Sequence, residues 1–189
     1  DAIKGAEVFG SVKRGYVSRK STEDIIARSV LGSAELGTFL TPSQVLNYVE
    51  AHDNYNLYDL LSYVHPNDSQ EKIKKQVEVA TAMNLLFQGM AFMQVGQEFL
   101  RTKLVATGED GEVTPQDRER AMNSYNAPDA VNQVDWDLVS VNKDTIDYVR
   151  QLIHLKKTLP ALSLESYEEI YQHVFVHTAN MGSGVVVFE

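Results

Sequence analysis

Apolar residues recur at helical spacing in several parts of the chain and alternate with polar residues there. A helix start is marked before two of these stretches, where Ser21 and Thr22 or Asp68 and Ser69 can cap the first turn, and Glu71 completes a capping box with Asp68. The pattern predicts helices over residues 25–31, 57–64, 70–88 and 144–157. The third helix becomes apolar on all sides in its second half, which predicts that it ends in a buried place.

Two short apolar runs, residues 45–49 and 90–95, have the length and composition of buried strands. Each run ends in polar residues, and predicted helices lie between the two runs. Strand, polar tip, helix, strand and polar tip make a βαβ unit, which occurs in doubly wound sheets and in barrels. In both folds ligands bind at the carboxyl ends of the strands. The first strand would deliver His52, Asp53 and Asn54 to that end.

The remaining segments carry weaker patterns. Residues 2–9 suggest a short helix, and residues 101–142 lack strong periodicity. Aromatic residues among Asn and Asp in residues 123–137 favour a sugar-binding loop, and a solvated surface loop is the alternative. Residues 170–176 and 185–188 are rich in β-forming side chains, and with a turn at residues 180–184 they predict an antiparallel hairpin.

The two ends of the sequence suggest a piece of a longer protein. The first residues do not form a signal peptide, and the last residues stop within a predicted strand. A single hairpin is marginally stable in water, so it needs further strands. We therefore expect neighbouring polypeptide upstream and downstream of these residues.

Composition narrows the classes of partner. The 189 residues are 43% hydrophobic and 23% charged, with a formal net charge of −9. That charge disfavours nucleic acid and polybasic membrane contacts, and favours a neutral molecule or polymer. The absence of cysteine excludes disulfides and thiolate metal sites. No apolar run approaches the roughly 18 residues of a membrane span.

The polar tip at residues 52–54 has two interpretations. Asp-Asn pairs are common in turns, where their side chains bond the local backbone, and a His-Asp pair is as often structural as catalytic. The alternative is a functional site at a strand end, with a carboxylate, an imidazole and an amide side by side.

Several motifs in this chain occur together, in the same order, in one known family. They are Tyr48-Val-Glu-Ala-His-Asp-Asn54, then Gln88-Gly-Met-Ala-Phe-Met-Gln-Val-Gly-Gln-Glu-Phe-Leu-Arg101, then Asn123-Ser-Tyr-Asn126, and finally Asn132-Gln-Val-Asp-Trp136. Through them the chain resembles the type I pullulanases of the α-amylase superfamily of glycoside hydrolases, from residue 1 to about residue 165. Asp1 to Gly5 resembles the segment just past the sixth barrel strand of that family.

The resemblance implies an α/β fold. Residues 1–163 would be the C-terminal portion of a (β/α)8 TIM barrel, with its seventh and eighth strands. Residues 164–189 would be the first hairpin of an antiparallel β-sandwich domain. It also implies a bacterial enzyme, secreted or held at the cell surface.

The implied activity is endo-acting, retaining hydrolysis of α-1,6-glucosidic branch linkages in pullulan, starch or glycogen. Retention needs a nucleophile and an acid/base about 5 Å apart. In the family these come from the fourth and fifth strands, so both would lie upstream of this sequence. The partners implied are an α-glucan and the rest of the same polypeptide. No cofactor is implied and no metal ligand is named, and a structural calcium ion is left open as an alternative without residues assigned to it.

The resemblance assigns roles to a few residues. Asp53 matches the carboxylate that stabilises the transition state by bonding sugar hydroxyls, and His52 matches the histidine that binds the same sugar. Asn54 would reach the acceptor-side ring, and Asp129 and Asn132 would contact donor-side sugars. Glu50 and Glu98 are interpreted separately, as buried and paired structural acids at strand ends.

Three alternatives remain open. Within the enzyme class the chain could belong to an isoamylase-type or another α-amylase-superfamily enzyme, although residues 123–136 favour a pullulanase. It could be a catalytically inert fragment that only binds glucan, because the upstream carboxylate pair is missing. It could also be a complete small α/β protein of unrelated function.

Overall fold

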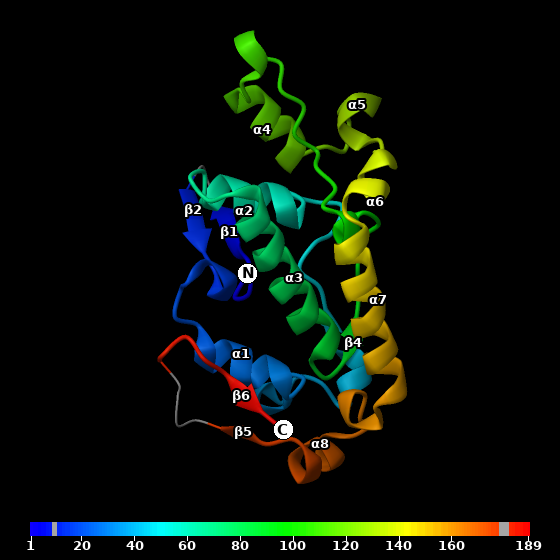
Figure 1. The fold of residues 1–189 in the computed structure, drawn as a ribbon. Helices are drawn as coiled ribbons and strands as arrows, with labels where there is room; N and C mark the ends of the chain where they lie inside the picture. The colour runs from blue at the N-terminus through cyan, green and yellow to red at the C-terminus, as the bar shows by residue number, and fades with distance from the viewer. Residues whose placement is uncertain (9–10, 178–181) are drawn as a thin grey trace.

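The computed structural model describes residues 1–8, 11–177 and 182–189, and it combines helices with three two-stranded sheets (Figure 1). The α-helices are α1 (Glu23–Val30), α2 (Leu57–Val64), α3 (Gln70–Leu86), α4 (Pro115–Met122), α5 (Asp129–Asn132), α6 (Asp137–Val141), α7 (Lys143–Thr158) and α8 (Tyr167–His173). The strands are β1 (Gly5–Val8), β2 (Ser11–Arg14), β3 (Leu46–Asn47), β4 (Met90–Ala91), β5 (Val176–His177) and β6 (Val187–Phe188). The short 3-10 helices used below are η3 (Pro42–Gln44), η4 (Gln97–Phe99) and η6 (Pro160–Leu162).

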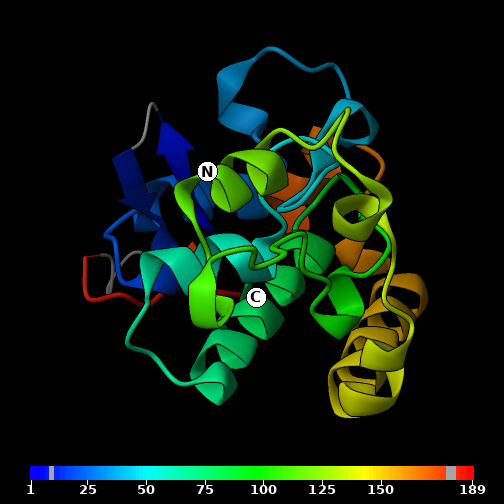
Figure 2. The same cartoon turned by 90° about the horizontal axis from the view of Figure 1, so that it is seen from above.

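Helix α3 is the element around which the others pack. It lies against α2 on one side and against α7 on another, and Figures 1 and 2 show α7 running beside it. Its first turn is capped by the Ser69 hydroxyl, which accepts a 3.3 Å hydrogen bond from the Lys72 amide. The four helices that the periodicity predicts are confirmed as α1, α2, α3 and α7.

The core is divided among several groups of buried side chains. One joins the end of β3 to α2 and α3, and comprises Val49, Leu57, Leu61, Ile73, Val77, Ala80 and Leu100. A second joins the end of α3 to α7 through Leu85, Val149 and Leu152. The prediction that α3 ends in a buried place is confirmed, because Leu85 and Phe87 are 5% and 3% exposed. Nearer its middle the helix keeps a solvent-facing side, where Val79 is 47% exposed while Val77 is 1% exposed.

Strands β3 and β4 are parallel, with Leu46 opposite Met90 and Asn47 opposite Ala91. Since α2 and α3 lie between them in sequence, the predicted βαβ unit is confirmed. Gly89 makes the close approach possible: its φ is +102°, and a Cβ there would lie 2.9 Å from the Val45 carbonyl oxygen.

The two strands are shorter and more exposed than the sequence predicts. Leu46 is 52% exposed and Met90 is 49% exposed, so the prediction of strands buried on both faces was wrong. Val45 and Val49 do point into the protein. Within the described residues β3 and β4 form a sheet of two strands only, which leaves part of their apolar surface uncovered.

The predicted helix over residues 2–9 was wrong. Residues 5–8 form β1 instead, which pairs antiparallel with β2 so that Gly5 lies opposite Arg14. A Cβ at Gly5 would lie 2.1 Å from the Lys13 carbonyl oxygen, so glycine permits this pairing. Phe9 and Gly10 lie outside the described residues.

Residues 101–142 are not a structureless loop. They contain α4, α5 and α6. A capping box begins α4, in which the Thr114 hydroxyl bonds the Asp117 amide while the Asp117 carboxylate bonds the Thr114 amide, and Pro115 occupies the first helical turn. Local capping, rather than apolar periodicity, defines this helix.

The last residues form a helix and a hairpin. Ile170 lies in α8, which begins with a capping box between Ser166 and Glu169, so the β-structure expected at that residue was wrong. The hairpin pairing is confirmed, with Val176 opposite Phe188. These strands pack against α1 through a buried group that includes Ile26, Val30 and Phe87. Residues 178–181, where part of the predicted turn falls, lie outside the described residues, and the division at residue 164 stays a prediction.

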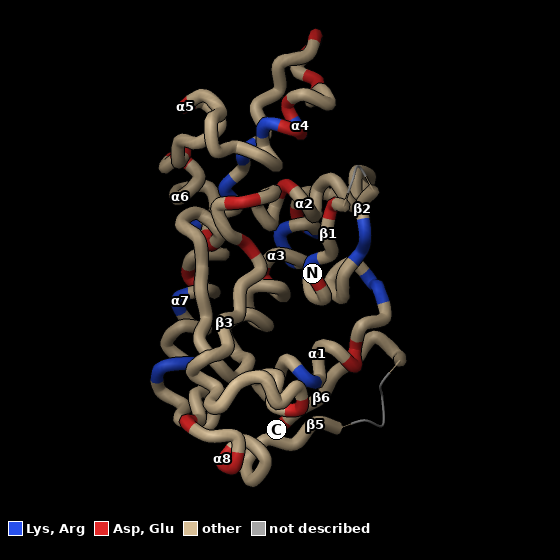
Figure 3. Tube along the Cα trace, turned by 180° about the vertical axis from the view of Figure 1, so that it is seen from behind, with Lys and Arg blue, Asp and Glu red and all other residues tan. Residues whose placement is uncertain are grey.

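The distribution of charge and the apolar character of the helices bear on the kinds of partner the chain can have. Lys and Arg residues are distributed over several elements rather than gathered on one face (Figure 3). Among the described residues, the helices lack the combination of length and apolar character that crossing a membrane requires.

Candidate functional site

The polar turn at residues 52–54 lies between two buried segments, residues 49–50 and 56–57, which together are called the frame below. Val49 and Glu50 are 3% and 1% exposed before the turn, and Asn56 and Leu57 are fully buried after it. The three turn residues between them are exposed. The chain therefore comes to the surface for these residues alone and presents their side chains to solvent.

Glu50 joins the two sides of the frame. Its Oε2 accepts a 2.7 Å hydrogen bond from the amide of Leu57, the first residue of α2. An anion is favoured at a helix N-terminus, where amides lack partners. Burial raises the pKa of Glu50 to about 7, while the Leu57 amide and the Lys4 ammonium act in the opposite direction.

A second buried acid, Asp59, attaches α2 to the chain that follows η4. Its carboxylate accepts hydrogen bonds from the Thr102 hydroxyl at 2.5 Å and the Lys103 amide at 2.8 Å. Burial raises the pKa of Asp59 to about 6, against the effect of these bonds and of the Lys103 charge. The Lys103 ammonium then lies beneath the polar turn, 2.5 Å from the Asn54 carbonyl oxygen and 3.4 Å from that of His52.

The segment after α4 is held beside the turn by Arg101 and Asn132. The Arg101 guanidinium donates to the Asn132 carbonyl at 2.5 Å. The Asn132 side-chain amide donates to the carbonyls of Ser124 at 2.7 Å and Ala127 at 3.3 Å. This amide folds residues 124–132 into a compact loop, as Asn commonly does through backbone bonds.

Together these segments enclose a hollow of about 280 Å³ at the end of the parallel strands. Its lining comprises His52, Asp53, Gln94, Arg101, Lys103, Ser124, Tyr125 and Asn132. Tyr125 is 82% exposed, and the Gln94 Oε1 atom is buried without a hydrogen-bond partner among the described residues. An exposed aromatic face, an amide and a carboxylate are the groups that stack on sugar rings and bond hydroxyls.

The predicted site residues are partly brought together. His52, Asp53 and Asn132 line the same hollow, with the His52 Nε2 3.6 Å from an Asp53 carboxylate oxygen. Asn54 lines a different hollow, of about 140 Å³, on the side of β1. Asp129 is exposed at the start of α5, outside the lining of the first hollow.

The two acids interpreted as structural differ in the structure. Glu50 is buried and bridges the frame, as expected. Glu98 is only half-buried and accepts a 3.1 Å hydrogen bond from the Gly96 amide within its own turn. The description of Glu98 as a buried, paired acid was therefore wrong, because η4 turns its side chain back onto the preceding backbone.

Sequence reasoning missed Arg101, Lys103 and Asp59. All three are buried, at 6%, 2% and 1% exposure. Cations in a weakly patterned stretch are usually solvated, and Asp59 lies on the opposite side of α2 from its apolar stripe. Their partners lie tens of residues away, so local spacing carried no signal for them.

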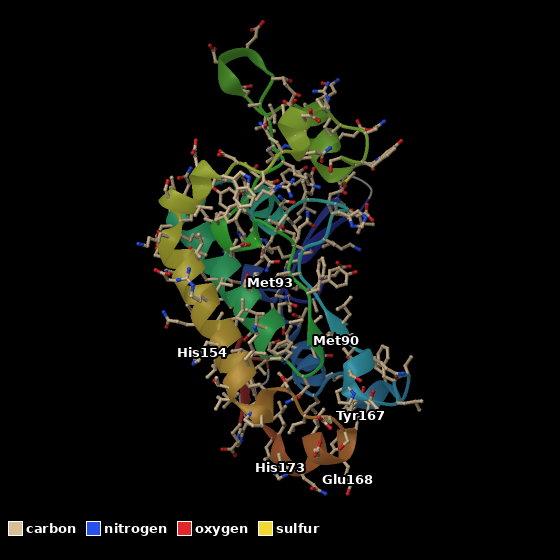
Figure 4. The ribbon with its side chains drawn as sticks, turned by 90° about the vertical axis from the view of Figure 1, so that its right-hand side faces the viewer. Met90, Met93, His154, Tyr167, Glu168 and His173 are labelled. Atoms are coloured by element: carbon tan, nitrogen blue, oxygen red, sulfur yellow. The ribbon has the colours of Figure 1, made fainter. Side chains whose placement is uncertain are left out.

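A larger hollow, of about 920 Å³, lies away from this site. It is mostly apolar and is bounded by η3, β4, α7 and residues 163–165 just after η6, with Met90, Met93 and Ile153 in its wall. Figure 4 shows Met90 and Met93 along the chain after α3, with His154 on the neighbouring helix and Tyr167, Glu168 and His173 on α8 below. The wall of this 920 Å³ hollow is formed in part by the uncovered apolar surface of β4, and not by a cluster of reactive side chains.

Residues 1–8, 11–177 and 182–189 contain no group of three or more His, Cys, Asp or Glu side chains arranged to hold an ion.

The chain is similar to pullulanases of known sequence. It is 37% identical to the pullulanase of Bacillus subtilis over 133 residues, which is 70% of this chain and 16% of that protein. It is 27% identical to pullulanase A of Streptococcus pneumoniae over 177 residues, covering 77% of this chain and 14% of that protein. The chain thus spans about a sixth of the length of these curated relatives. No family model matches it.

Solved structures give the same result. The pullulanase of Paenibacillus barengoltzii, solved in complex with maltohexaose and α-cyclodextrin, superposes with a TM-score of 0.79 at 34% identity over 95% of this chain and 26% of that one. The Bacillus acidopullulyticus pullulanase superposes with a TM-score of 0.77 at 33% identity, over 93% and 20% of the two chains.

These matches first define a class: the relatives of this chain are glycoside hydrolases. Within that class, the chain is related to the type I pullulanases and corresponds to one part of them.

Proposed function

We propose that this chain is the part of a pullulanase-type debranching hydrolase that carries its transition-state-stabilising carboxylate, Asp53. The natural polypeptide containing these residues, called the parent polypeptide below, would cleave α-1,6 branch linkages in α-glucans. The observation that supports this most directly is the convergence of Asp53, His52 and Tyr125 on one hollow, in a chain related to pullulanases.

The chemistry of the turn suits that role. The Asp53 side chain is 75% exposed and lies next to His52. A fixed carboxylate can accept hydrogen bonds from sugar hydroxyls and favour the positive charge that develops on an oxocarbenium-like ring. His52 could bond the same ring, and Tyr125 offers a face for stacking. The nucleophile and the acid/base would come from elsewhere in the parent polypeptide.

The proposed fold is the last part of a (β/α)8 barrel. The parallel pair β3 and β4, with the site at their carboxyl ends, supports it. The apolar surface left uncovered on β4 and around the 920 Å³ hollow suits contact with the remaining barrel strands. Asn54 and Asp129 would contact neighbouring sugars from outside the main hollow.

We propose that the parent polypeptide works without a cofactor. We also propose that it is secreted by a bacterium or held at the bacterial cell surface. The relatives from Bacillus subtilis and Streptococcus pneumoniae support a bacterial source. A relative from Arabidopsis thaliana is named as chloroplastic, so location differs among related proteins.

The test is linkage selectivity. The parent polypeptide should release reducing ends from pullulan and from a branched glucan, while linear amylose stays intact. NMR of the first-formed product should show retention of the anomeric configuration. Cleavage of amylose at a similar rate would favour a different α-amylase-superfamily activity. Binding of glucan without any hydrolysis would favour the inert glucan-binding alternative.

A further inference from the structure

The position of Asp53 is set by its backbone rather than by its side chain. The side chain is three-quarters exposed, and it makes an ionic contact with His52, whose side chain is still more exposed, at 87%. The next residue, Asn54, has a φ of +63°, which is uncommon for a residue with a side chain. Such a conformation persists where the surroundings hold it in place.

Lys103 supplies that restraint from below. It is 2% exposed, and its ammonium bonds the carbonyl oxygens of Asn54 and His52, the two neighbours of Asp53. A third contact reaches the Ser124 hydroxyl at 3.3 Å. Hydrogen bonds from a charged donor are stronger than neutral ones, and these two hold the peptide unit that precedes Asp53 and the one that follows Asn54.

The lysine is itself anchored. Its amide donates to the buried Asp59 carboxylate on α2, and burial lowers the pKa of its ammonium while the Asp59 charge opposes that shift. The backbone anchor and the ammonium therefore act as a rigid connection from α2 to the polar turn. A solvent-exposed lysine would lose side-chain conformational entropy on adopting this geometry. The side chain of Lys103 has already lost that entropy through its burial.

We infer that Lys103 is a positioning residue for Asp53, fixing the carboxylate through the main-chain carbonyls on either side of it. This inference rests on the proposed function. A displacement of about 1 Å at a catalytic group can lower the rate about 10²-fold. Loss of the lysine should therefore reduce kcat while substrate affinity, set by other contacts, changes little.

The experiment is a double-mutant cycle in the parent polypeptide with pullulan as substrate. Lys103→Met should lower kcat about 10²-fold with little change in KM. The same substitution placed on Asp53→Asn should cause little further loss, because the carboxylate that it positions is already gone. Equal fractional losses in both backgrounds, or an unchanged kcat, would overturn the inference.

A matched control separates positioning from general loosening. Lys156 makes the same kind of contact elsewhere, with its ammonium on the carbonyls of Phe87 at 2.7 Å and Leu162 at 2.5 Å. Lys156→Met should lower the unfolding midpoint but leave kcat unchanged, and a loss of kcat equal to that of Lys103→Met would contradict the inference. Should Lys103→Met not fold, Lys103→Gln serves in the same cycle.

The outcomes also separate this inference from the proposed function. A parent polypeptide that does not cleave pullulan, or one in which Asp53→Asn retains full activity, overturns both. An active parent whose Asp53→Asn variant is inactive and whose Lys103 variants are fully active overturns only the positioning role.

Discussion

The carboxylate of Glu50 and the main-chain amide of Leu57 lie 2.7 Å apart and hold the two sides of the polar turn together. Six residues intervene in sequence, including all three exposed ones. The bond places a buried acid at the start of α2, where it both caps the helix and sets the width of the frame.

The pKa of Glu50 gives this relationship a pH dependence. The folded value of about 7 lies above the ordinary 4.5, so the folded state retains a proton that the unfolded state has lost. The free energy of unfolding should then fall as pH rises from about 4.5 to about 7, by at most about 3 kcal/mol from this group. Glu50→Gln keeps an acceptor for Leu57 and should flatten that slope. An unchanged pH profile of the unfolding midpoint would contradict this origin.

Two valines on α3 offer a matched test of the core. Val77→Asp should lower the free energy of unfolding by about 3 kcal/mol or more, because it introduces an unpaired carboxylate at a position that is 1% exposed. Val79→Asp makes the same change where the side chain is 47% exposed, and should stay within about 0.5 kcal/mol. Urea unfolding of both variants measures the difference. Equal midpoints would mean that α3 is oriented differently.

Gln88 connects the end of α3 to the chain that leads into α8. Its side-chain amide donates to the Ala161 carbonyl at 2.7 Å, and its side-chain oxygen accepts from the Leu164 amide at 3.1 Å. Gln88→Leu should destabilise the protein by about 1–3 kcal/mol, since it removes two hydrogen bonds made by a side chain that is 2% exposed. The exposed Gln172→Leu is the control. A urea midpoint for Gln88→Leu that matches the control would exclude this connection.

The longer helices could be predicted from sequence because a single buried face imposes its period on many residues. In α7 the stripe of Ile146, Val149 and Ile153 marked the helix within one residue at each end. Short elements have too few residues for such a repeating pattern to be recognised. At α8 the β-branched Ile170, followed by Val174 and Val176, suggested strand, whereas the capping box of Ser166 and Glu169 begins a helix there.

The residues of the candidate site also fall into those that could be predicted from the sequence and those that could not. Asp53 and His52 could be located because they follow an apolar run in an unusual motif, and the structure brings them together in one hollow. Lys103 and Arg101 could not, because a buried cation is recognised by partners that only the fold brings near. The exposure of Leu46 and Met90 could not be predicted either, since strand composition does not reveal how many neighbours a sheet has.

The central claim is that Asp53 stabilises the transition state of glucan hydrolysis. Asp53→Asn removes the charge but keeps the size, and the side chain is exposed, so folding should be spared. Asp24→Asn makes the same change on an exposed residue of α1 and should retain full activity. The most direct measurement is reducing-sugar release from pullulan by the parent polypeptide and these two variants. We expect turnover to collapse in Asp53→Asn alone, with an unchanged unfolding midpoint. Wild-type turnover in Asp53→Asn would contradict the account.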